Sequence, residues 1–174
     1  LMYLYLSKIV EKKYLDFYIP DRNAEGYGIS TEGINYAKEN DFSLIIALDC
    51  GIKAGDKIEY ANSLGIDFIV CDHHLPGDEL PNAYAVLDPK RNDCRYPYKE
   101  LSGCGVGFKL CQGLNTIYKI PETELHELTD LLAISIAADI VAMTGENRVL
   151  AKLGLMPTLI SRPSILTVAS PSAV

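Results

Sequence analysis

The sequence lacks a hydrophobic run long enough to span a bilayer. Its apolar opening, Leu1–Val10, is not followed by a small-residue cleavage site, so we predict no signal peptide. The sequence also lacks a C-x-x-C pair, and its five cysteines are an odd number. This pattern argues against a disulfide framework and a zinc ribbon and favours a reducing compartment. We therefore expect a cytoplasmic protein with structural thiols and no membrane partner.

An excess of basic residues is missing as well. The chain has 16 Lys and Arg against 23 Asp and Glu, which gives a net charge of −7. Proteins that bind nucleic acid through many phosphates usually present a basic face, so the composition alone speaks against such a protein. A site for divalent cations would also be acidic, because bound cations offset clustered carboxylates. The net charge therefore excludes neither a nucleic-acid-binding protein nor a protein with a divalent-cation site.

The hydrophobic pattern predicts alternating strands and helices, without an internal repeat. Residues 43–48 (SLIIAL) and 66–71 (IDFIVC) are continuous apolar runs, typical of strands buried on both faces of a parallel sheet. A predicted helix, Lys53–Leu64, separates them and indicates a right-handed crossover. We also predict helices at Met2–Lys13, Ser30–Asn40, Val106–Lys119, Glu122–Met143 and Glu146–Leu153, and strands at Leu15–Pro20 and Tyr84–Leu87. The expected fold class is α/β, a parallel sheet with a helical second half.

Polar side chains follow both apolar runs directly. Asp49 ends the first, and Asp72, His73 and His74 follow the second. In open parallel sheets, ligands bind beyond the carboxyl ends of the strands. A lone Asp49 would often only cap the next helix, and the two histidines would otherwise be a hydrogen-bonded loop pair. Both groups at neighbouring strand ends favour a metal site, and mixed oxygen and imidazole ligands suit manganese, magnesium or zinc.

Asp139 is the third candidate ligand. It is the only charged residue in the segment 131–143 (LLAISIAADIVAM). A buried carboxylate without a partner is costly, so we expect Asp139 to face a cation or strong hydrogen-bond donors. The alternative is an acid at a helix end on the protein surface.

Several strings of the sequence resemble one family. Asp49-Cys50-Gly51, Cys71-Asp72-His73-His74 and Ala137-Ala138-Asp139 resemble the second, third and fourth motifs of the DHH phosphoesterases. Within that superfamily the chain is most similar to the bacterial RecJ-like exonucleases, through residues 19–30 (IPDRNAEGYGIS), 87–91 (LDPKR), 96–108 (YPYKELSGCGVGF) and 145–150 (GENRVL). The resemblance predicts a DHH-type core over residues 1–155. The tail, residues 156–174, is rich in Ser, Pro and Thr without helical or strand periodicity, so we expect it to be poorly structured.

The resemblance also implies a role for each motif residue. Asp49 would be shared between two Mn²⁺ or Mg²⁺ ions, and His73 and Asp139 would complete the shell of the second ion. His74 would contact the scissile phosphate, and Asp72 would orient a histidine ring. The implied activity is phosphodiester hydrolysis with two cations, acting on single-stranded DNA from 5′ to 3′ in recombination and repair. The implied partners are single-stranded DNA, a single-strand-binding protein and a helicase.

Other residues are candidates for contact with the substrate. Arg22 would hold a phosphate through a bidentate contact, or form a salt bridge with Glu25. Lys90, Arg91 and Arg95 form a basic cluster that would either track a DNA strand or lie in a solvated loop.

Three glycines precede or begin the predicted helix at Val106. The backbone amides of Gly103, Gly105 and Gly107 would approach a phosphate, or the glycines would form a tight turn packed on the sheet.

The chain also departs from the family pattern. The first DHH motif, a strand that ends in paired aspartates, lies upstream of a helix like Met2–Lys13, and this chain begins within that helix. We therefore expect an incomplete core that binds one metal ion weakly and is nearly inactive. Two other functions remain open at this point: a DHH phosphodiesterase for short oligonucleotides or cyclic dinucleotides, and a degenerate fragment without catalysis.

Overall fold

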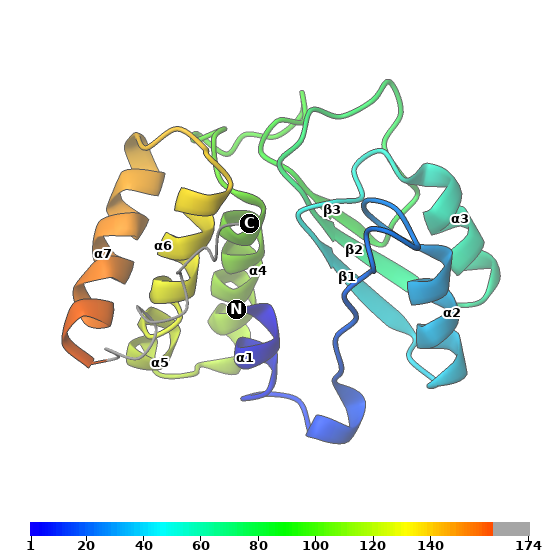
Figure 1. Cartoon of the computed structure of the whole chain (residues 1–174), viewed down its shortest axis with the longest axis horizontal. Helices are drawn as coiled ribbons and strands as arrows, with labels where there is room; N and C mark the ends of the chain where they lie inside the picture. The colour runs from blue at the N-terminus through cyan, green and yellow to red at the C-terminus, as the bar shows by residue number, and fades with distance from the viewer. Residues whose placement is uncertain (162–174) are drawn as a thin grey trace, which may run out of the picture.

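The computed structural model of the chain describes residues 1–161 and contains a parallel sheet with helices on both sides (Figure 1). Strands β1 (Leu44–Leu48), β2 (Asp67–Cys71) and β3 (Ala85–Leu87) pair in the order β1-β2-β3. Both pairings are parallel, with Leu48 opposite Cys71 and Cys71 opposite Leu87. The predicted α/β class is confirmed.

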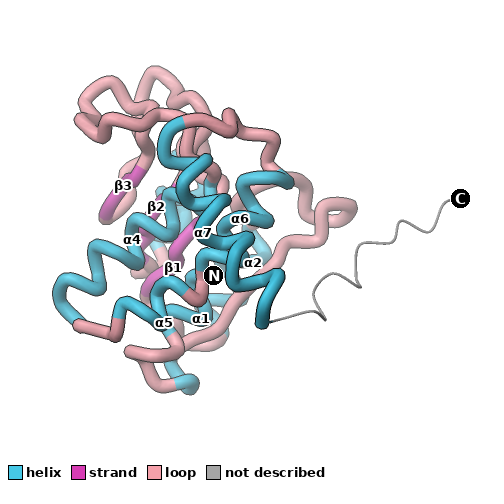
Figure 2. Tube along the Cα trace, turned by 90° about the vertical axis from the view of Figure 1, so that its left-hand side faces the viewer, coloured by secondary structure: helices cyan, strands magenta, loops and turns pink. Residues whose placement is uncertain are grey.

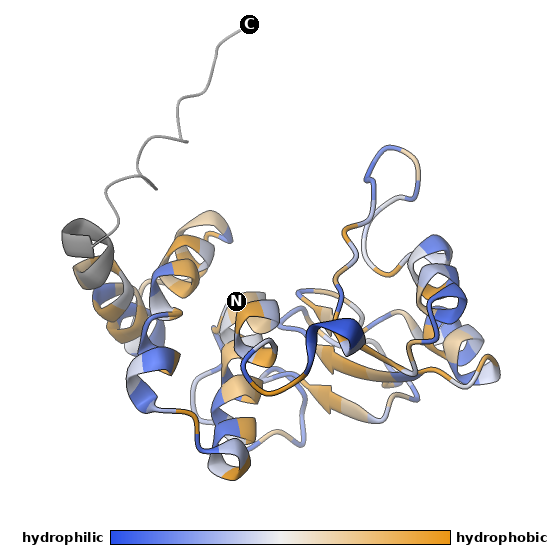
Figure 3. Ribbon diagram, turned by 90° about the horizontal axis from the view of Figure 1, so that it is seen from below, coloured by the Kyte–Doolittle hydropathy of each residue, from blue (hydrophilic) through white to orange (hydrophobic). Residues whose placement is uncertain are grey.

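Two apolar cores lie on the two faces of the sheet. Helices α2 (Thr31–Glu39) and α3 (Gly55–Ser63) cover one face, where Phe68 and Val70 are buried. Helices α1 (Met2–Leu6) and α4 (Gly103–Tyr118) cover the other face, where Cys71 is buried. Neighbouring residues along β2 therefore serve opposite cores, as the period of a strand requires. In Figure 3 the strands carry the hydrophobic colour.

The second half of the described chain is helical, as predicted. Helices α5 (Glu122–His126), α6 (Thr129–Ala138) and α7 (Gly145–Ser161) follow α4. Helices α6 and α7 pack closely at Gly154 of α7. A Cβ at this position would lie only 1.9 Å from the carbonyl oxygen of Thr129 in α6. Figure 2, seen from the helical side, shows these helices in front of the strands. No helix of the described residues is long and apolar enough to cross a membrane.

The predicted first helix, Met2–Lys13, is wrong in extent. Helix α1 ends at Leu6, and a separate 3₁₀ turn covers Lys12–Tyr14. The Ser7 hydroxyl donates to the Leu4 carbonyl, a local bond that competes with helix continuation, and β-branched Ile9 and Val10 follow.

The predicted strand at Leu15–Pro20 is also wrong. The segment is in no ladder of the sheet. Pro20 has no N–H to donate, and the Tyr18 ring packs on Tyr36 at 5.4 Å between centroids.

The ends of the helical half also differ from the prediction. The predicted helix Glu122–Met143 is two helices, because the Thr129 hydroxyl donates to the His126 carbonyl at 2.6 Å where α6 begins. Helix α7 continues past the predicted end at Leu153 and into the segment predicted as a tail. The rest of that tail, residues 162–174, lies outside the described residues.

Strand β1 has no neighbour on its outer edge among the described residues. Leu44 and Leu48, at its two ends, are 45% and 39% exposed. The expectation that residues 43–48 are buried on both faces therefore holds only in part. An apolar strand at an open edge presents unpaired backbone N–H and C=O groups to any strand that can lie beside it.

Candidate metal centre

Three aspartates follow the three strands in register. Asp49 comes directly after β1, Asp72 after β2 and Asp88 after β3. The backbone extends the ladder by one step at each junction: Asp49 N–H donates to the Cys71 carbonyl at 2.9 Å, and Asp72 N–H donates to the Leu87 carbonyl at 3.0 Å. The fold thus gathers three carboxylates and the following histidines at one edge of the sheet.

Asp49 has an unusual backbone conformation. Its φ of 66° lies in the left-handed region, which few non-glycine residues occupy. The conformation turns the chain away from the strand, and the Asp49 side chain stays half exposed, at 50%. Strained residues of this kind gather at functional sites.

The imidazole of His73 lies between two carboxylates that are distant in sequence. Its Nε2 is 3.0 Å from Asp49 Oδ1 and 3.3 Å from Asp139 Oδ2. The His73 side chain is only 8% exposed. The structure therefore brings together the three residues that the sequence singled out as ligands, from β1, β2 and the end of α6.

Asp139 reaches this cluster because α6 stops at it. Asp139 is the C-cap of α6, and the next residue, Ile140, has a φ of 53°, rare for a β-branched side chain. The Asp139 side chain is 25% exposed, so it is neither fully buried nor a surface acid. Its Oδ2 also accepts a long hydrogen bond, 3.4 Å, from Gly103 N–H.

The loop before α4 and the start of α7 hold this end of α6 in place. The Tyr96 hydroxyl donates to Glu146 at 2.5 Å, and the Tyr98 hydroxyl donates to the Thr144 carbonyl at 2.8 Å. The amide of Asn147 donates to the Ala142 carbonyl at 3.0 Å. The strings 96–108 and 145–150 thus pack against one another and fix the turn that carries Asp139.

The electrostatics favour a positive charge at the His73 ring. The Asp49 carboxylate raises the pKa of His73, burial acts in the opposite direction, and the charge of Asp139 adds to the increase. Neither ring nitrogen has a hydrogen bond of acceptable geometry, although two carboxylate oxygens face Nε2. Nε2 of His73, with two carboxylate oxygens facing it, is therefore a place where a proton or a metal cation would bind.

The spacing of the ligand atoms fits a small divalent cation. Adjacent ligands of an octahedral ion with bonds of about 2.1 Å lie about 3 Å apart. The separations at His73 Nε2 are close to this value. One ligand atom each of Asp49, His73 and His74 also lie within 4.8 Å of one another. Two carboxylates with imidazole are a donor set that manganese and magnesium accept.

Asp72 holds the two histidines of the site through hydrogen bonds. It is buried, and its Oδ1 accepts from the backbone N–H of His73 at 2.8 Å and lies 2.6 Å from Nδ1 of His74. Its Oδ2 accepts from Ile52 N–H at 2.9 Å. Burial opposes ionisation, but these hydrogen bonds together hold the pKa of Asp72 below its ordinary value. Asp72 orients the ring of His74, whose side chain remains 54% exposed.

The glycines of α4 serve close packing. A Cβ on Gly103 would lie 2.2 Å from Asp49 Oδ1, and a Cβ on Gly107 would lie 3.0 Å from Leu48 Cδ2. The Gly105 N–H donates to the Ser102 hydroxyl, which caps the helix. The predicted tight turn and the predicted helix start at Val106 are therefore wrong: the three glycines lie in the first turns of α4, where Gly103 and Gly107 let the helix pack on the end of β1.

Arg22 lies in the exposed turn before α2. Its guanidinium lies 4.8 Å from the centre of the Tyr27 ring. Glu25, the alternative partner, instead accepts from the Tyr18 hydroxyl and the Asp21 N–H, both at 2.8 Å. Arg22 therefore has no ion pair with Glu25 among the described residues.

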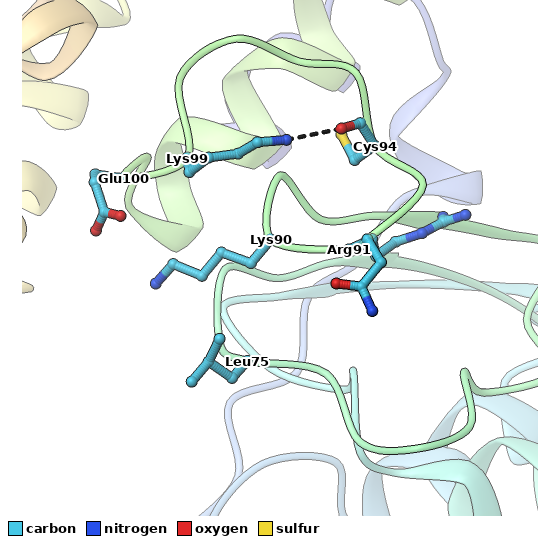
Figure 4. A pocket seen from close by; sticks show the side chains of 7 residues that line it. Leu75, Lys90, Arg91, Cys94, Lys99 and Glu100 are labelled. Atoms are coloured by element: carbon cyan, nitrogen blue, oxygen red, sulfur yellow. Dashed lines mark hydrogen bonds between the residues drawn. The ribbon is translucent and has the colours of Figure 1, made fainter.

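A basic pocket of about 640 Å³ lies beside the strand-end cluster (Figure 4). Leu75, directly after the two histidines, forms one wall, and Lys90 extends into the opening. Arg91 turns away, donating to the Val86 carbonyl and pairing with Asp93. Lys99 donates to the Cys94 carbonyl at 2.8 Å. Lys90 is thus the lysine whose ammonium is left for a ligand, whereas Arg95 does not line the pocket.

Asp88 also lies at this edge of the sheet, although it was not among the residues predicted from the sequence. It is 4% exposed and lies at the end of β3, beside Asp72. The sequence pattern that identified Asp49 and Asp72, an aspartate directly after an apolar strand, is present at Asp88 as well.

Comparisons with known proteins identify a family and relatives of this chain. The family model described as "DHH family, N-terminal domain" matches residues 1–136. The single-stranded-DNA-specific exonuclease RecJ of Bacillus subtilis (strain 168) is 48% identical over 141 residues, which are 81% of this chain and 17% of that protein. RecJ of Escherichia coli (strain K12) is 40% identical over 150 residues, which are 81% of this chain and 26% of that protein. The chain thus spans about a quarter or less of these relatives.

Two solved structures share the fold. A crystal structure of exonuclease RecJ bound to manganese superimposes with a TM-score of 0.70 at 33% identity, covering 81% of this chain and 36% of that one. RecJ from Thermus thermophilus in complex with Mn²⁺ gives a TM-score of 0.62 at 31% identity, covering 73% of this chain and 19% of that one.

Proposed function

Because the chain belongs to the DHH family, we propose that it forms the metal-binding core of a single-stranded-DNA-specific exonuclease that works with Mn²⁺ or Mg²⁺. The observation that carries the proposal is the position of His73 Nε2, which faces Asp49 at 3.0 Å and Asp139 at 3.3 Å. The RecJ relatives and the two manganese-bound neighbours support the substrate and the metal.

Different residues of the chain would have different roles in phosphodiester hydrolysis. Asp49, His73 and Asp139 would hold the cation, and a bound divalent cation supplies an activated water and stabilises the attacking and leaving oxygens. His74 is half exposed beside these ligands and fixed by Asp72, so its free Nε2 contacts a non-bridging oxygen of the scissile phosphate. The Asp72 carboxylate, 2.6 Å from Nδ1 of His74, keeps that ring oriented.

Lys90 provides the contact to the neighbouring part of the strand. It extends into the pocket that begins at Leu75, one residue after His74. A phosphate adjacent to the scissile one would meet its ammonium there, as a point charge. Arg22, stacked on exposed Tyr27, would bind another phosphate of the substrate.

The open edge of β1 supports a further strand beside this sheet. The first family motif, a strand that ends in paired aspartates, would pair there and bring its carboxylates next to Asp49. Those carboxylates would supply much of the shell of the first of the two ions, beside the ion held by His73 and Asp139. The 174 residues alone would then bind one ion weakly and turn over slowly. The complete protein would act from 5′ to 3′ in the cytoplasm, in recombination and repair, together with a single-strand-binding protein and a helicase.

A nuclease assay tests this function. The sequence is extended upstream to include a strand with paired aspartates and assayed with Mn²⁺ on single-stranded DNA, duplex DNA and a dinucleotide. We expect the extension to raise the rate on single strands and Asp139→Asn to lower it by about 100-fold or more. Asp67→Asn, at the opposite end of β2, is the matched control and should leave the rate unchanged. Preference for the dinucleotide, or full activity of Asp139→Asn, would contradict the proposal.

A further inference from the structure

The side-chain amide of Asn147 is buried between two segments of backbone. Asn147 lies in the first turn of α7 and is 0% exposed. Its Nδ2 donates to the Glu100 carbonyl at 2.5 Å and to the Ala142 carbonyl at 3.0 Å. The amide group has two protons, and each of them is therefore used in a hydrogen bond to a different segment.

Both segments lead to the same carboxylate. Ala142 lies in the turn that begins at Asp139, and Glu100 lies in the loop that leads into α4 at Gly103. The Gly103 N–H donates to Asp139 Oδ2 at 3.4 Å. In Figure 1 the loop between α6 and α7 and the loop that enters α4 lie at the same end of these helices. Asn147 thus joins the segment that carries Asp139 to the segment that contacts it.

The turn after α6 needs contacts that hold it in place. Ile140 has a φ of 53°, a conformation that costs free energy for a β-branched residue, and its side chain is 90% exposed. The Tyr98 hydroxyl also donates to the Ala142 carbonyl, at 3.1 Å, but this bond lies at the exposed side of the turn. Water can replace an exposed hydrogen bond, whereas the loss of a buried partner leaves a carbonyl unsatisfied. The buried bonds of Asn147 are therefore the stronger restraint.

The position requires a hydrogen-bond donor. Both groups that face Nδ2 of Asn147 are carbonyl oxygens, so an exchange of the amide nitrogen and oxygen would set three acceptors against one another. Oδ1 of Asn147 has no hydrogen-bond partner among the described residues. The polar role of this side chain is therefore to donate to the two segments.

We propose that Asn147 is a positioning residue for Asp139. Its amide joins the two segments and so holds the Asp139 carboxylate 3.3 Å from Nε2 of His73. Asp139 is the C-cap of α6, where the backbone is no longer restrained by the helix, so its place depends on such bonds. The inference rests on the proposed function for its metal, but the position of Asp139 exists without a metal.

Asn147→Asp removes the donor and keeps the shape of the side chain. An ionised carboxylate only accepts hydrogen bonds, and here it would face two carbonyl oxygens. Asn115→Asp, toward the other end of α4, is the matched control. It loses the bond from Nδ2 to the Ile120 carbonyl at 3.1 Å, which lies in the loop after that helix.

Mn²⁺ affinity is measured from the free Mn²⁺ signal in electron paramagnetic resonance, at a temperature where circular dichroism shows each variant to be folded. Asn147→Asp should weaken binding by about 10-fold or more relative to Asn115→Asp. Added to Asp139→Asn, Asn147→Asp should change the affinity by less than about twofold, because the ligand through which it acts is already lost. A merely structural role would give the same loss in both backgrounds, and that result would overturn the proposal.

Nuclear magnetic resonance of the metal-free chain tests the same role without Mn²⁺. The Gly103 amide signal should move in Asn147→Asp toward its position in Asp139→Asn, and it should stay in place in Asn115→Asp. An unmoved Gly103 signal in folded Asn147→Asp would overturn the proposal.

The side-chain NH₂ protons of Asn147 in the wild type provide a measurement that does not depend on any variant. We expect them to be protected from exchange with solvent, and rapid exchange would overturn the proposal even if Asn147→Asp does not fold. Absence of Mn²⁺ binding in the wild type, together with the moved Gly103 signal, would instead contradict the proposed function and leave the role of Asn147 standing.

Discussion

Gly103, the first residue of α4, lies directly against the side chain of Asp49. A Cβ at this position would be 2.2 Å from Oδ1 and 2.5 Å from Cγ of Asp49, far inside van der Waals contact. The small residue lets the helix approach the end of β1 and confines the carboxylate that faces His73. The glycine therefore helps to set the position of a metal ligand without contacting the metal.

Gly103→Ala should displace Asp49 or the start of α4. We expect Mn²⁺ affinity to fall by about 10–100-fold and the free energy of unfolding to fall by about 1–3 kcal/mol. Isothermal titration calorimetry and urea unfolding measure the two effects.

Gly113→Ala is the control on the same helix. Nothing lies within 4 Å of a Cβ at Gly113, so alanine should stabilise the protein slightly, by about 0.5–1 kcal/mol, and leave Mn²⁺ affinity unchanged. Equal effects of the two substitutions would show that Gly103 has no special relation to Asp49.

Asp72→Ala should destabilise the fold. The substitution removes the acceptor for the backbone N–H groups of Ile52 and His73, and we expect a loss of about 2–4 kcal/mol in urea unfolding. Asp67→Asn, exposed at the far end of β2, should change the stability by less than about 0.5 kcal/mol.

The pH dependence of stability reports on the same carboxylate. The pKa of Asp72 is lower in the folded chain than the ordinary value. Its contribution is therefore complete above the unfolded pKa of about 3.9 and is lost as the pH falls below that value. Asp72→Asn should flatten the loss of stability below about pH 4. An unchanged acid profile in this variant would contradict the hydrogen-bonded, ionised state of Asp72.

Lys90→Ala should weaken the binding of single-stranded DNA. One phosphate contact fewer reduces the slope of log K against log salt concentration by about 0.7. Fluorescence anisotropy with a labelled oligothymidylate, without divalent metal, measures the slope. Lys152→Ala, on the exposed side of α7, should leave affinity and slope unchanged. Equal slopes for wild type and Lys90→Ala would exclude a phosphate contact at this pocket.

The sequence predicted the sheet and its carboxyl edge well, because apolar runs of strand length with polar residues directly after them have few other interpretations. Asp49 and His73 were located this way, and Asp139 by the cost of a lone charge in an apolar segment. Their mutual distances could not be predicted, since they depend on where α6 ends and on the packing of Gly103 against Asp49.

Other features were predicted wrongly or not at all, for local reasons. The first helix stops early because Ser7 bonds to the Leu4 carbonyl, which hydrophobic periodicity does not register. Leu15–Pro20 has strand-like residues but no ladder partner among the described strands. Asp88 was overlooked because β3 is only 3 residues long and an Asp-Pro pair usually indicates a turn.

Paramagnetic broadening of the histidine ring signals by Mn²⁺ tests most directly whether Asp49, His73 and Asp139 converge on one cation. Mn²⁺ below one equivalent is added to the ¹⁵N-histidine-labelled chain, with Asp139→Asn and Asp67→Asn for comparison. We predict that the signals of His73 and His74 broaden first while that of exposed His126 stays sharp. Asp139→Asn should reduce this broadening, and Asp67→Asn should not. Equal broadening of all three histidines, or broadening unaffected by Asp139→Asn, would contradict this prediction.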